Sequence, residues 1–302
     1  LSLCGARGLI CGSRLSRRAE GLDQLKQLEF VLGEEAQWQG KFAQDSTCRV
    51  VDRPTILAAM DDRPPSASMN ARDRAAIIYT SGSTGLPKGV TLTHANIVAN
   101  TESIVQYLQL RERDRVLVVL PFHYVYGKSL LNTHVAAGGS VVIENRFMFP
   151  QKALDTLANS EATGLSGVPS TFAILLNRSN FAERAFPALR YVTQAGGAMA
   201  PELQRRLVEA LVGKEIFIMY GATEASARLS YLKPVDLDRK IGSIGKAIPG
   251  VELRVLCEDG SEAGVGQVGE IVASGANIME GYWNEPEETA AVLDKDGYHT
   301  GE

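Results

Sequence analysis

The chain has 302 residues, of which 45% are hydrophobic and 22% charged, an ordinary composition for a globular protein. Its length suits one large domain or two small ones. The formal charge of -4 gives no overall attraction to nucleic acid, and no apolar run approaches the ~18 residues that a membrane span needs. We therefore expect no nucleic-acid partner and no membrane span.

The four cysteines, Cys4, Cys11, Cys48 and Cys257, are scattered and form no Cys-x-x-Cys pair. Scattered cysteines are typical of reduced thiols in a cytoplasmic protein. The chain starts at Leu1, and polar residues and glycines interrupt the apolar residues at its start, so it has no continuous apolar run of the kind found in a signal peptide. We expect a cytoplasmic fragment, cut at both ends.

The first 70 residues carry the weakest pattern. Short apolar runs predict strands at residues 8–12 and 30–32, and the leucine spacing predicts a helix over residues 14–28. Residues 61–74 hold two prolines and six charged side chains, which favours an exposed loop.

A strand, a polar loop and a second strand follow. Apolar runs at residues 75–78 and 90–93 have the length of strands. The loop between them, residues 79–89, reads Tyr-Thr-Ser-Gly-Ser-Thr-Gly-Leu-Pro-Lys-Gly. Glycines let a backbone approach a ligand, hydroxyls add donors and lysine adds a positive charge, which together favour a polyphosphate over a plain surface turn. It is not a Walker A motif, because Ser or Thr would then follow the lysine. The candidate phosphate-binding residues are Thr80, Ser81, Gly82, Ser83, Thr84, Gly85 and Lys88.

From residue 94 onward, predicted helices and strands alternate. The helices are predicted at residues 94–108, 128–137, 150–160, 169–177 and from Pro201, and the strands at residues 115–120, 140–144, 163–168, 189–194 and 215–220. This alternation predicts an α/β fold of mostly parallel sheets with helices on both faces. Ligands of such sheets bind beyond the carboxyl ends of the strands. We expect the motifs at residues 79–89, 194–198 and 219–224 to lie at such ends.

The amino-acid composition changes after residue 240, where glycine becomes frequent. Short strands are predicted at residues 251–257 and 268–273, and a helix at residues 284–293. The chain is therefore predicted to divide into an α/β core over residues 1–240 and a small β-rich subdomain over residues 241–302.

Residues 219–224, Met-Tyr-Gly-Ala-Thr-Glu, contain further candidates at the end of a predicted strand. Tyr220 is suited to stack on a purine, and Gly221 lets a ligand approach. Thr223 is suited to donate to a phosphate oxygen, and Glu224 to hold Mg²⁺, which prefers hard oxygen ligands. A Thr-Glu pair is equally common as a helix cap.

Two other segments are ambiguous when taken alone. Gly196 and Gly197, followed by Ala198, are also typical of a tight turn after a strand. His123 lies in the aromatic run of residues 121–127, Pro-Phe-His-Tyr-Val-Tyr-Gly, and a histidine among aromatic residues is usually a packed structural residue.

Together these motifs resemble those of the acyl-adenylate-forming superfamily, which includes acyl-CoA synthetases, adenylation domains of peptide synthetases and luciferases. The resemblance covers residues 75–302 and keeps the family's order of motifs. It implies that the hydroxyl loop binds the phosphates of ATP, and that residues 196–198 lie along the adenine and line the carboxylate pocket. It also implies that His123 borders the acyl pocket. In the family, domains that activate amino acids tend to have an aspartate near this segment that pairs with the ammonium group of the substrate. Residues 121–131 contain no acid, so the resemblance favours a plain carboxylic acid over an amino acid as substrate.

The last five residues, Tyr-His-Thr-Gly-Glu, resemble the family's Tyr-Arg-Thr-Gly-Asp, whose acid binds both ribose hydroxyls. Here His299 replaces the arginine and Glu302 replaces the aspartate. The extra methylene of Glu302 moves its carboxylate by roughly the length of one C–C bond. The resemblance implies that Glu302 binds the ribose, although its side chain is one methylene longer than that of the family's aspartate.

The resemblance implies ATP-dependent activation of a carboxylic acid to an acyl-adenylate, then thioester formation with coenzyme A as co-substrate. ATP and Mg²⁺ would bind the chain, with Lys88, His123, Thr223 and Glu224 as the catalytic set. The family's catalytic lysine lies in a small C-terminal domain beyond residue 302, so we expect this chain to adenylate ~10²–10³ times more slowly than a full-length relative. Two alternatives remain: an adenylation domain that loads a carrier-protein thiol in peptide or siderophore synthesis, and a truncated ATP-binding module without turnover.

Overall fold

The computed structural model describes residues 3–10, 25–33, 38, 48–59, 67–80 and 87–302. The chain divides into two compact units, residues 1–69 and 70–302. The elements of the first unit are strands β1 (Gly8–Ile10), β2 (Phe30–Leu32) and β3 (Arg49–Val51), which pair in parallel in that order, and helix α2 (Arg53–Ala59). The strand predicted at residues 30–32 is confirmed, and the one predicted at residues 8–12 is confirmed over residues 8–10, since residues 11 and 12 lie outside the described residues. Most of the helix predicted over residues 14–28 lies outside the described residues, and the described residues 25–28 are not helical.

A seven-stranded sheet forms the centre of the second unit, in the order β12-β11-β10-β9-β8-β6-β7. Its strands are β6 (Arg115–Val118), β7 (Ser140–Ile143), β8 (Gly164–Gly167), β9 (Tyr191–Gln194), β10 (Glu215–Tyr220), β11 (Ser230–Leu232) and β12 (Lys246–Ala247). Strands β6 to β10 are parallel to one another, and β11 and β12 add antiparallel strands at one edge.

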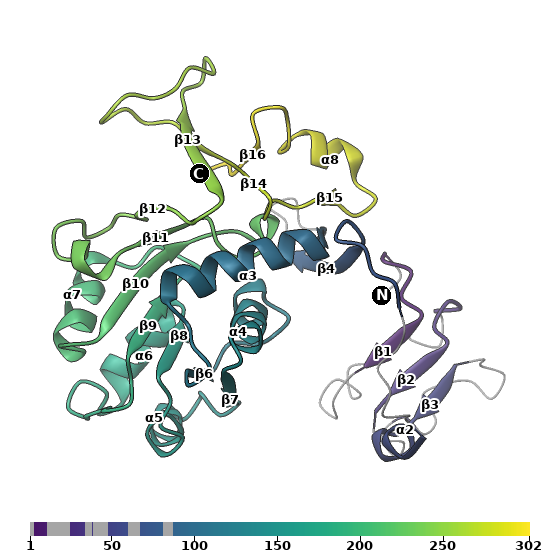
Figure 1. Cartoon of the computed structure of the whole chain (residues 1–302), viewed down its shortest axis with the longest axis horizontal. Coiled ribbons are helices and arrows are strands. Elements are labelled where there is room, and N and C mark those ends of the chain that lie inside the picture. Colours follow the sequence, from purple (N-terminus) through teal and green to yellow (C-terminus); the bar gives the residue numbers. More distant parts are fainter. Residues whose placement is uncertain (1–2, 11–24, 34–37, 39–47, 60–66, 81–86) are drawn as a thin grey trace. The chain divides into compact units, whose positions relative to one another are not determined.

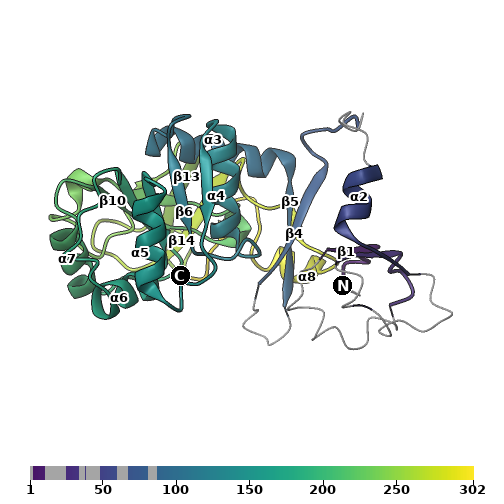
Figure 2. The same ribbon diagram turned by 90° about the horizontal axis from the view of Figure 1, so that it is seen from below.

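Helices cover both faces of this sheet (Figure 1 and Figure 2). They are α3 (His94–Leu108), α4 (Val125–Ala136), α5 (Pro150–Asn159), α6 (Pro169–Arg178) and α7 (Pro201–Ala210). Successive side chains of a strand point to opposite faces, so Ile216 packs in one core with α5, α6 and α7, while Phe217 packs in another with α3 and α4. The predicted α/β class, with mostly parallel strands between two helical layers, is confirmed.

Two smaller antiparallel sheets flank the main one. The first has the order β15-β5-β4 and the second β13-β14-β16. Their elements are β4 (Arg74–Thr80), β5 (Lys88–Thr93), β15 (Gly281–Tyr282), β13 (Val251–Leu256), β14 (Glu270–Gly275) and β16 (Tyr298–His299), with the short helix α8 (Pro286–Ala290) beside β15.

The hydroxyl loop of residues 79–89 has a different setting from the one expected. It joins β4 to β5, which pair with each other antiparallel in the small sheet. The expectation that this loop follows a strand of the parallel sheet is therefore wrong. The physical reason is the short connection, because antiparallel neighbours need only a short loop, whereas a parallel crossover needs a dozen or more residues.

The C-terminal part of the chain contributes to all three sheets of the second unit. The strands predicted at residues 251–257 and 268–273 are confirmed as β13 and β14. Strand β12, however, joins the seven-stranded sheet, and β15 pairs with β5. The division into domains at residue 240 stays a prediction.

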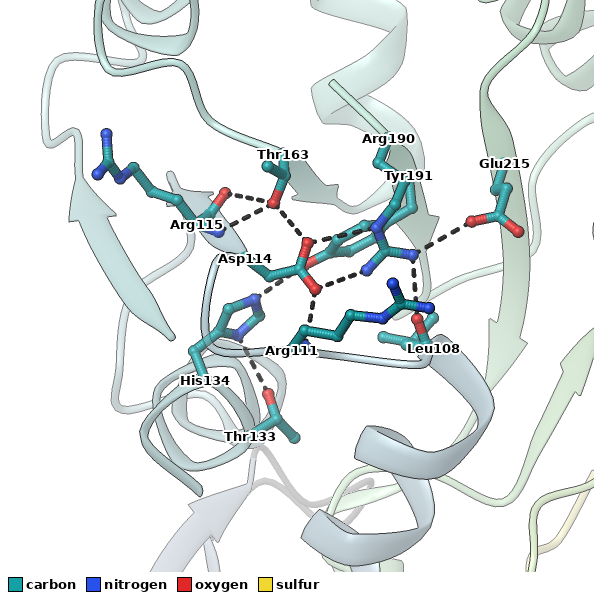
Figure 3. Close-up of polar contacts among 10 residues, drawn as sticks. All are labelled: Leu108, Arg111, Asp114, Arg115, Thr133, His134, Thr163, Arg190, Tyr191 and Glu215. Carbon is teal, nitrogen blue, oxygen red and sulfur yellow. Dashed lines mark hydrogen bonds and ion pairs between the residues drawn. The ribbon is translucent and has the colours of Figure 1, made fainter. Parts of the chain in front are cut away.

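A buried polar network closes the amino ends of the parallel strands (Figure 3). Asp114 accepts from Nη2 of Arg190 at 2.8 Å, from Oγ1 of Thr163 at 2.9 Å and from the backbone N–H of Arg111 at 2.8 Å. Burial acts to raise the pKa of Asp114, but these hydrogen bonds outweigh it and hold the pKa below its ordinary value. Beside this carboxylate, Nε2 of His134 lies 2.8 Å from the hydroxyl of Tyr191. The network lies at the edge of the sheet opposite the carboxyl ends, where ligands of such sheets bind.

Candidate functional site

The carboxyl end of β10 leads directly into the segment 220–224. Gly221 is required there, because a Cβ at this position would lie 2.1 Å from the carbonyl oxygen of Ala227. The chain then turns into a short 3-10 helix, Thr223–Ala225, and both Thr223 and Glu224 are half-buried. This turn presents a hydroxyl and a carboxylate beyond the strand end, as the sequence predicts.

A cavity of about 540 Å³ opens at the same edge of the sheet. Gly196, which follows β9 with φ +82°, and Gly221 and Thr223, which follow β10, all line it. The wall also includes aromatic and aliphatic side chains from the start of α4, and one cation. The full set is Leu120, Pro121, Tyr124, Val125, Tyr126, Val168, Gly196, Gly221, Ala222, Thr223, Ala227 and Arg228.

Lys88 and Glu224 are linked through Tyr282. The Lys88 Nζ lies 5.2 Å from the centre of the Tyr282 ring, and the Tyr282 hydroxyl donates to Oε1 of Glu224 at 2.8 Å. Burial, and then the neighbouring Glu224 carboxylate, raise the pKa of Tyr282. Lys88 also forms an ion pair with Glu288 in α8. The lysine of the hydroxyl loop and the acid of segment 220–224 therefore belong to one cluster.

The C-terminal residues also contact the segment 220–224, since Tyr298 packs in one core with Tyr220 and Ala222. Strand β16 pairs with β14, and Nδ1 of His299 lies 2.9 Å from Oε2 of Glu270. Burial, together with the Glu302 carboxylate close to the hydroxyl, raises the pKa of Tyr220 to about 12. The structure thus brings Tyr220 and Glu302 together, the two residues assigned to the nucleoside.

Other sequence-predicted residues are less closely joined. Ser81, Gly82, Ser83, Thr84 and Gly85 lie outside the described residues. Thr80 and Lys88, which flank them, face each other across the hairpin. Gly197 and Ala198 are exposed beyond β9. His123 is exposed as well. Its ring centre lies 4.5 Å from that of Tyr124. Tyr124 lines the cavity, whereas His123 does not line it.

Sequence reasoning missed three residues of this region: Tyr282, Glu288 and Arg228. Each has partners far away in sequence, and no motif assigns it a role. For Tyr282 the only local signal is the aromatic run Gly-Tyr-Trp at residues 281–283. For Arg228 the signal would be a lone charge in an otherwise small and apolar run, Ala-Ser-Ala-Arg-Leu.

Glu224 has the chemistry of a magnesium ligand. Its Oε1 accepts from Tyr282, and a carboxylate offers further acceptor positions. Within the described part of the chain, no three His, Cys, Asp or Glu residues gather as a metal cluster. One carboxylate beside substrate phosphates is a usual setting for Mg²⁺, so the residues present fit this ion.

None of the described helices combines the length and apolar character needed to cross a bilayer.

Comparisons with known proteins place these features in a family. A sulfoacetate–CoA ligase of Cupriavidus necator is 37% identical over 249 residues, 81% of this chain and 47% of that protein. A mitochondrial medium-chain acyl-CoA ligase, ACSF2, of Rattus norvegicus is 30% identical over 93% of this chain and 46% of that protein. The chain thus spans about half the length of the curated relatives it matches.

A solved structure has the same fold. It is the o-succinylbenzoate coenzyme A synthetase of Bacillus subtilis in complex with ATP and magnesium ion, which superposes with a TM-score of 0.77 at 28% identity over 96% of this chain and 58% of that one. In addition, a family profile described as "AMP-binding enzyme" matches residues 1–283. The chain therefore belongs to the AMP-binding enzyme family, within the acyl-adenylate-forming superfamily.

Proposed function

We propose that this chain provides the ATP-binding and acid-binding part of an AMP-forming ligase, which activates a carboxylic acid as an acyl-adenylate and passes the acyl group to coenzyme A. One observation carries the proposal: Lys88, Tyr282 and Glu224 form a cluster beside Thr223, which lines the cavity. A cation, a carboxylate and a hydroxyl are thereby grouped where a polyphosphate and a carboxylic acid would meet.

The residues divide the work by their chemistry. Lys88 and the hydroxyls of residues 80–84 would hold the β- and γ-phosphates, and Thr223 would donate to the α-phosphate. Glu224 would hold Mg²⁺, which neutralises phosphate charge when bound. Gly196 would let the adenine lie against the backbone, with Tyr220 and Glu302 at the nucleoside. The chain's contribution is positioning and charge neutralisation, the main tasks in transfer at phosphorus.

The family comparisons favour coenzyme A over a carrier protein as acceptor. The similar proteins named above are CoA ligases or a coenzyme A synthetase. Their acids differ widely, from sulfoacetate to medium-chain acids and o-succinylbenzoate, so the relatives support the reaction class but not one particular acid.

Nucleotide binding tests the proposal on the chain itself. Lys88→Ala should weaken the affinity for Mg·ATP by about tenfold or more, because a charge-assisted phosphate contact is lost. Lys246→Ala is the matched control, since the Lys246 Nζ also lies over a tyrosine ring, that of Tyr231, at 5.8 Å. Isothermal titration calorimetry measures both. Equal affinities in the two variants, or no ATP binding by the unaltered chain, would refute the proposal.

A further inference from the structure

Arg228 is a buried cation in the wall of the cavity. Only 3% of its surface is exposed. Its guanidinium carbon lies 4.1 Å from the centre of the Tyr126 ring, a stacked arrangement that stabilises the cation through the electron-rich face. Tyr126 is itself fixed, because its hydroxyl donates to the carbonyl oxygen of Thr193 at 2.9 Å. The arginine therefore rests on a rigid aromatic platform.

The partners of this guanidinium are neutral. It donates from Nη1 to the Ala227 carbonyl oxygen at 2.8 Å and from Nε to Sδ of Met219, a weak acceptor, at 3.3 Å. The hydroxyl of Tyr107 lies beside it. Among the described residues, no carboxylate forms an ion pair with Arg228. A buried charge is costly unless an opposite charge compensates it, so the fold leaves one counter-charge to be supplied.

The backbone that carries Arg228 is held in an unusual conformation. Ser226 and Ala227 have φ values of +57° and +118°. The side-chain amides of Asn100 and Asn277 both donate to the carbonyl oxygen of Arg228, at 3.0 Å each. Both asparagines are buried, with 2% exposed. Residues that carry a Cβ adopt such φ values only where the surroundings enforce them, so this turn fixes the backbone of Arg228 beside the cavity.

We propose that Arg228 selects acids that carry a second anionic group, distal to the carboxylate that is activated. Arg228 and Thr223 line the same cavity, with apolar side chains such as Val125 and Val168 in the same wall. The cavity therefore combines a hydroxyl, apolar walls and a buried cation, the three kinds of surface that would suit a substrate with an activated carboxylate, a short apolar middle and an anionic end, such as a dicarboxylate. The anionic end would form the bidentate contact that guanidinium favours. This inference rests on the proposed function, because it takes the cavity as the site of the acid.

The proposed selectivity of Arg228 can be tested with non-hydrolysable mimics of the acyl-adenylate. In these mimics a sulfamoyl group replaces the phosphate of the adenylate. Three mimics share one spacer and end in carboxylate, carboxamide or methyl, and the spacer is varied in length. At the best length, the unaltered chain should bind the carboxylate-ended mimic about tenfold or more tightly than the methyl-ended one, with the carboxamide between them. In Arg228→Met, a change to an apolar side chain of similar length, this order should be lost or inverted. Arg228→Lys should retain part of the preference.

The controls separate this inference from the proposed function. AMP is titrated alone into each protein. If the unaltered chain binds AMP but prefers the methyl-ended mimic at every length, the inference fails and the proposed function stands. If Arg228→Met weakens AMP and all three mimics equally, Arg228 serves the nucleotide phosphate and the inference again fails. If AMP and the mimics do not bind, both proposals fail. Should Arg228→Met not fold, the preference of the unaltered chain alone decides.

Discussion

Asp114 shows how one buried carboxylate organises the edge of the sheet opposite the candidate site. It precedes β6, and it is held by Thr163, which precedes β8, and by Arg190, which precedes β9 (Figure 3). Three neighbouring strands are thereby tied at their amino ends through one side chain. Because Asp114 is only 2% exposed, its charge depends on these partners.

We predict that Asp114→Asn lowers the free energy of unfolding at pH 7 by about 2–3 kcal/mol, since Arg190 loses a buried partner. The folded-state pKa of Asp114 lies below its ordinary value. The stabilisation is therefore complete above the unfolded pKa of ~4 and disappears as the pH falls through the lower folded value. Urea unfolding over a pH series should show the difference between the two proteins shrinking in acid.

The exposed pair of Arg205 and Glu202, at 3.4 Å, provides the control for this prediction. Glu202→Gln should change the stability by no more than about 0.5 kcal/mol at any pH, because exposed pairs contribute little. A loss of the same size in both variants, or a difference for Asp114→Asn that does not vary with pH, would contradict the account.

The sequence alone predicted site roles for Lys88, Thr223 and Glu224 but did not predict the residues that join them. A motif names side chains that are close together in the chain, whereas the link from Lys88 to Glu224 passes through Tyr282, some two hundred residues further on than Lys88. Arg228 was missed for a related reason. An arginine among small residues looks solvent-exposed until the stacking on Tyr126 is known.

At the scale of elements, the turn after β10 is the most constrained part of the site. We predict that Gly221→Ala costs about 1–3 kcal/mol of stability, because the added methyl would meet the Ala227 carbonyl oxygen at 2.1 Å and has no room. Relief of that clash would shift the turn that carries Arg228, so ATP and acid affinity should fall as well. Thermal unfolding and calorimetry measure the two effects.

Gly264→Ala is the matched control for Gly221→Ala. The nearest atom to a Cβ at Gly264 is Oε1 of the flexible Gln267 side chain, at 3.3 Å, and its φ is not positive. This change should leave stability and ligand affinity close to those of the unaltered chain. If Gly221→Ala behaved in the same way, the close backbone approach at residue 221 would not be a constraint.

Elements with strong local signals were predicted well, and those that depend on distant pairing were not. The helix over residues 94–108 matches α3, because Thr93 accepts from the Asn96 N–H and so fixes its start. Strand β10 likewise has its predicted bounds. The two- and three-residue strands β11, β12, β15 and β16 were not predicted, since so short a segment is extended only because a partner strand lies beside it.

At the scale of the whole molecule, each of the two units has a hydrophobic core of its own among the described residues. The core of residues 1–69 contains Leu28, Val31 and Trp38, with neighbours from the same unit. Every core of the second unit is built from residues at or beyond Ala76. A domain with its own core can in principle fold alone. Each described residue of the candidate site also belongs to residues 70–302.

We therefore predict that a protein of residues 70–302 folds cooperatively and binds Mg·ATP with an affinity within about threefold of that of the whole chain. Its circular dichroism spectrum, a single thermal transition and calorimetric titration would establish this. The Lys88→Ala change should weaken ATP binding equally in the short and the whole chain, because Lys88, Tyr282 and Glu224 are all present in both. A short chain that folds but loses ATP affinity would mean that residues 1–69 contribute to the nucleotide site; one that does not fold would mean that the second unit depends on the first for its stability.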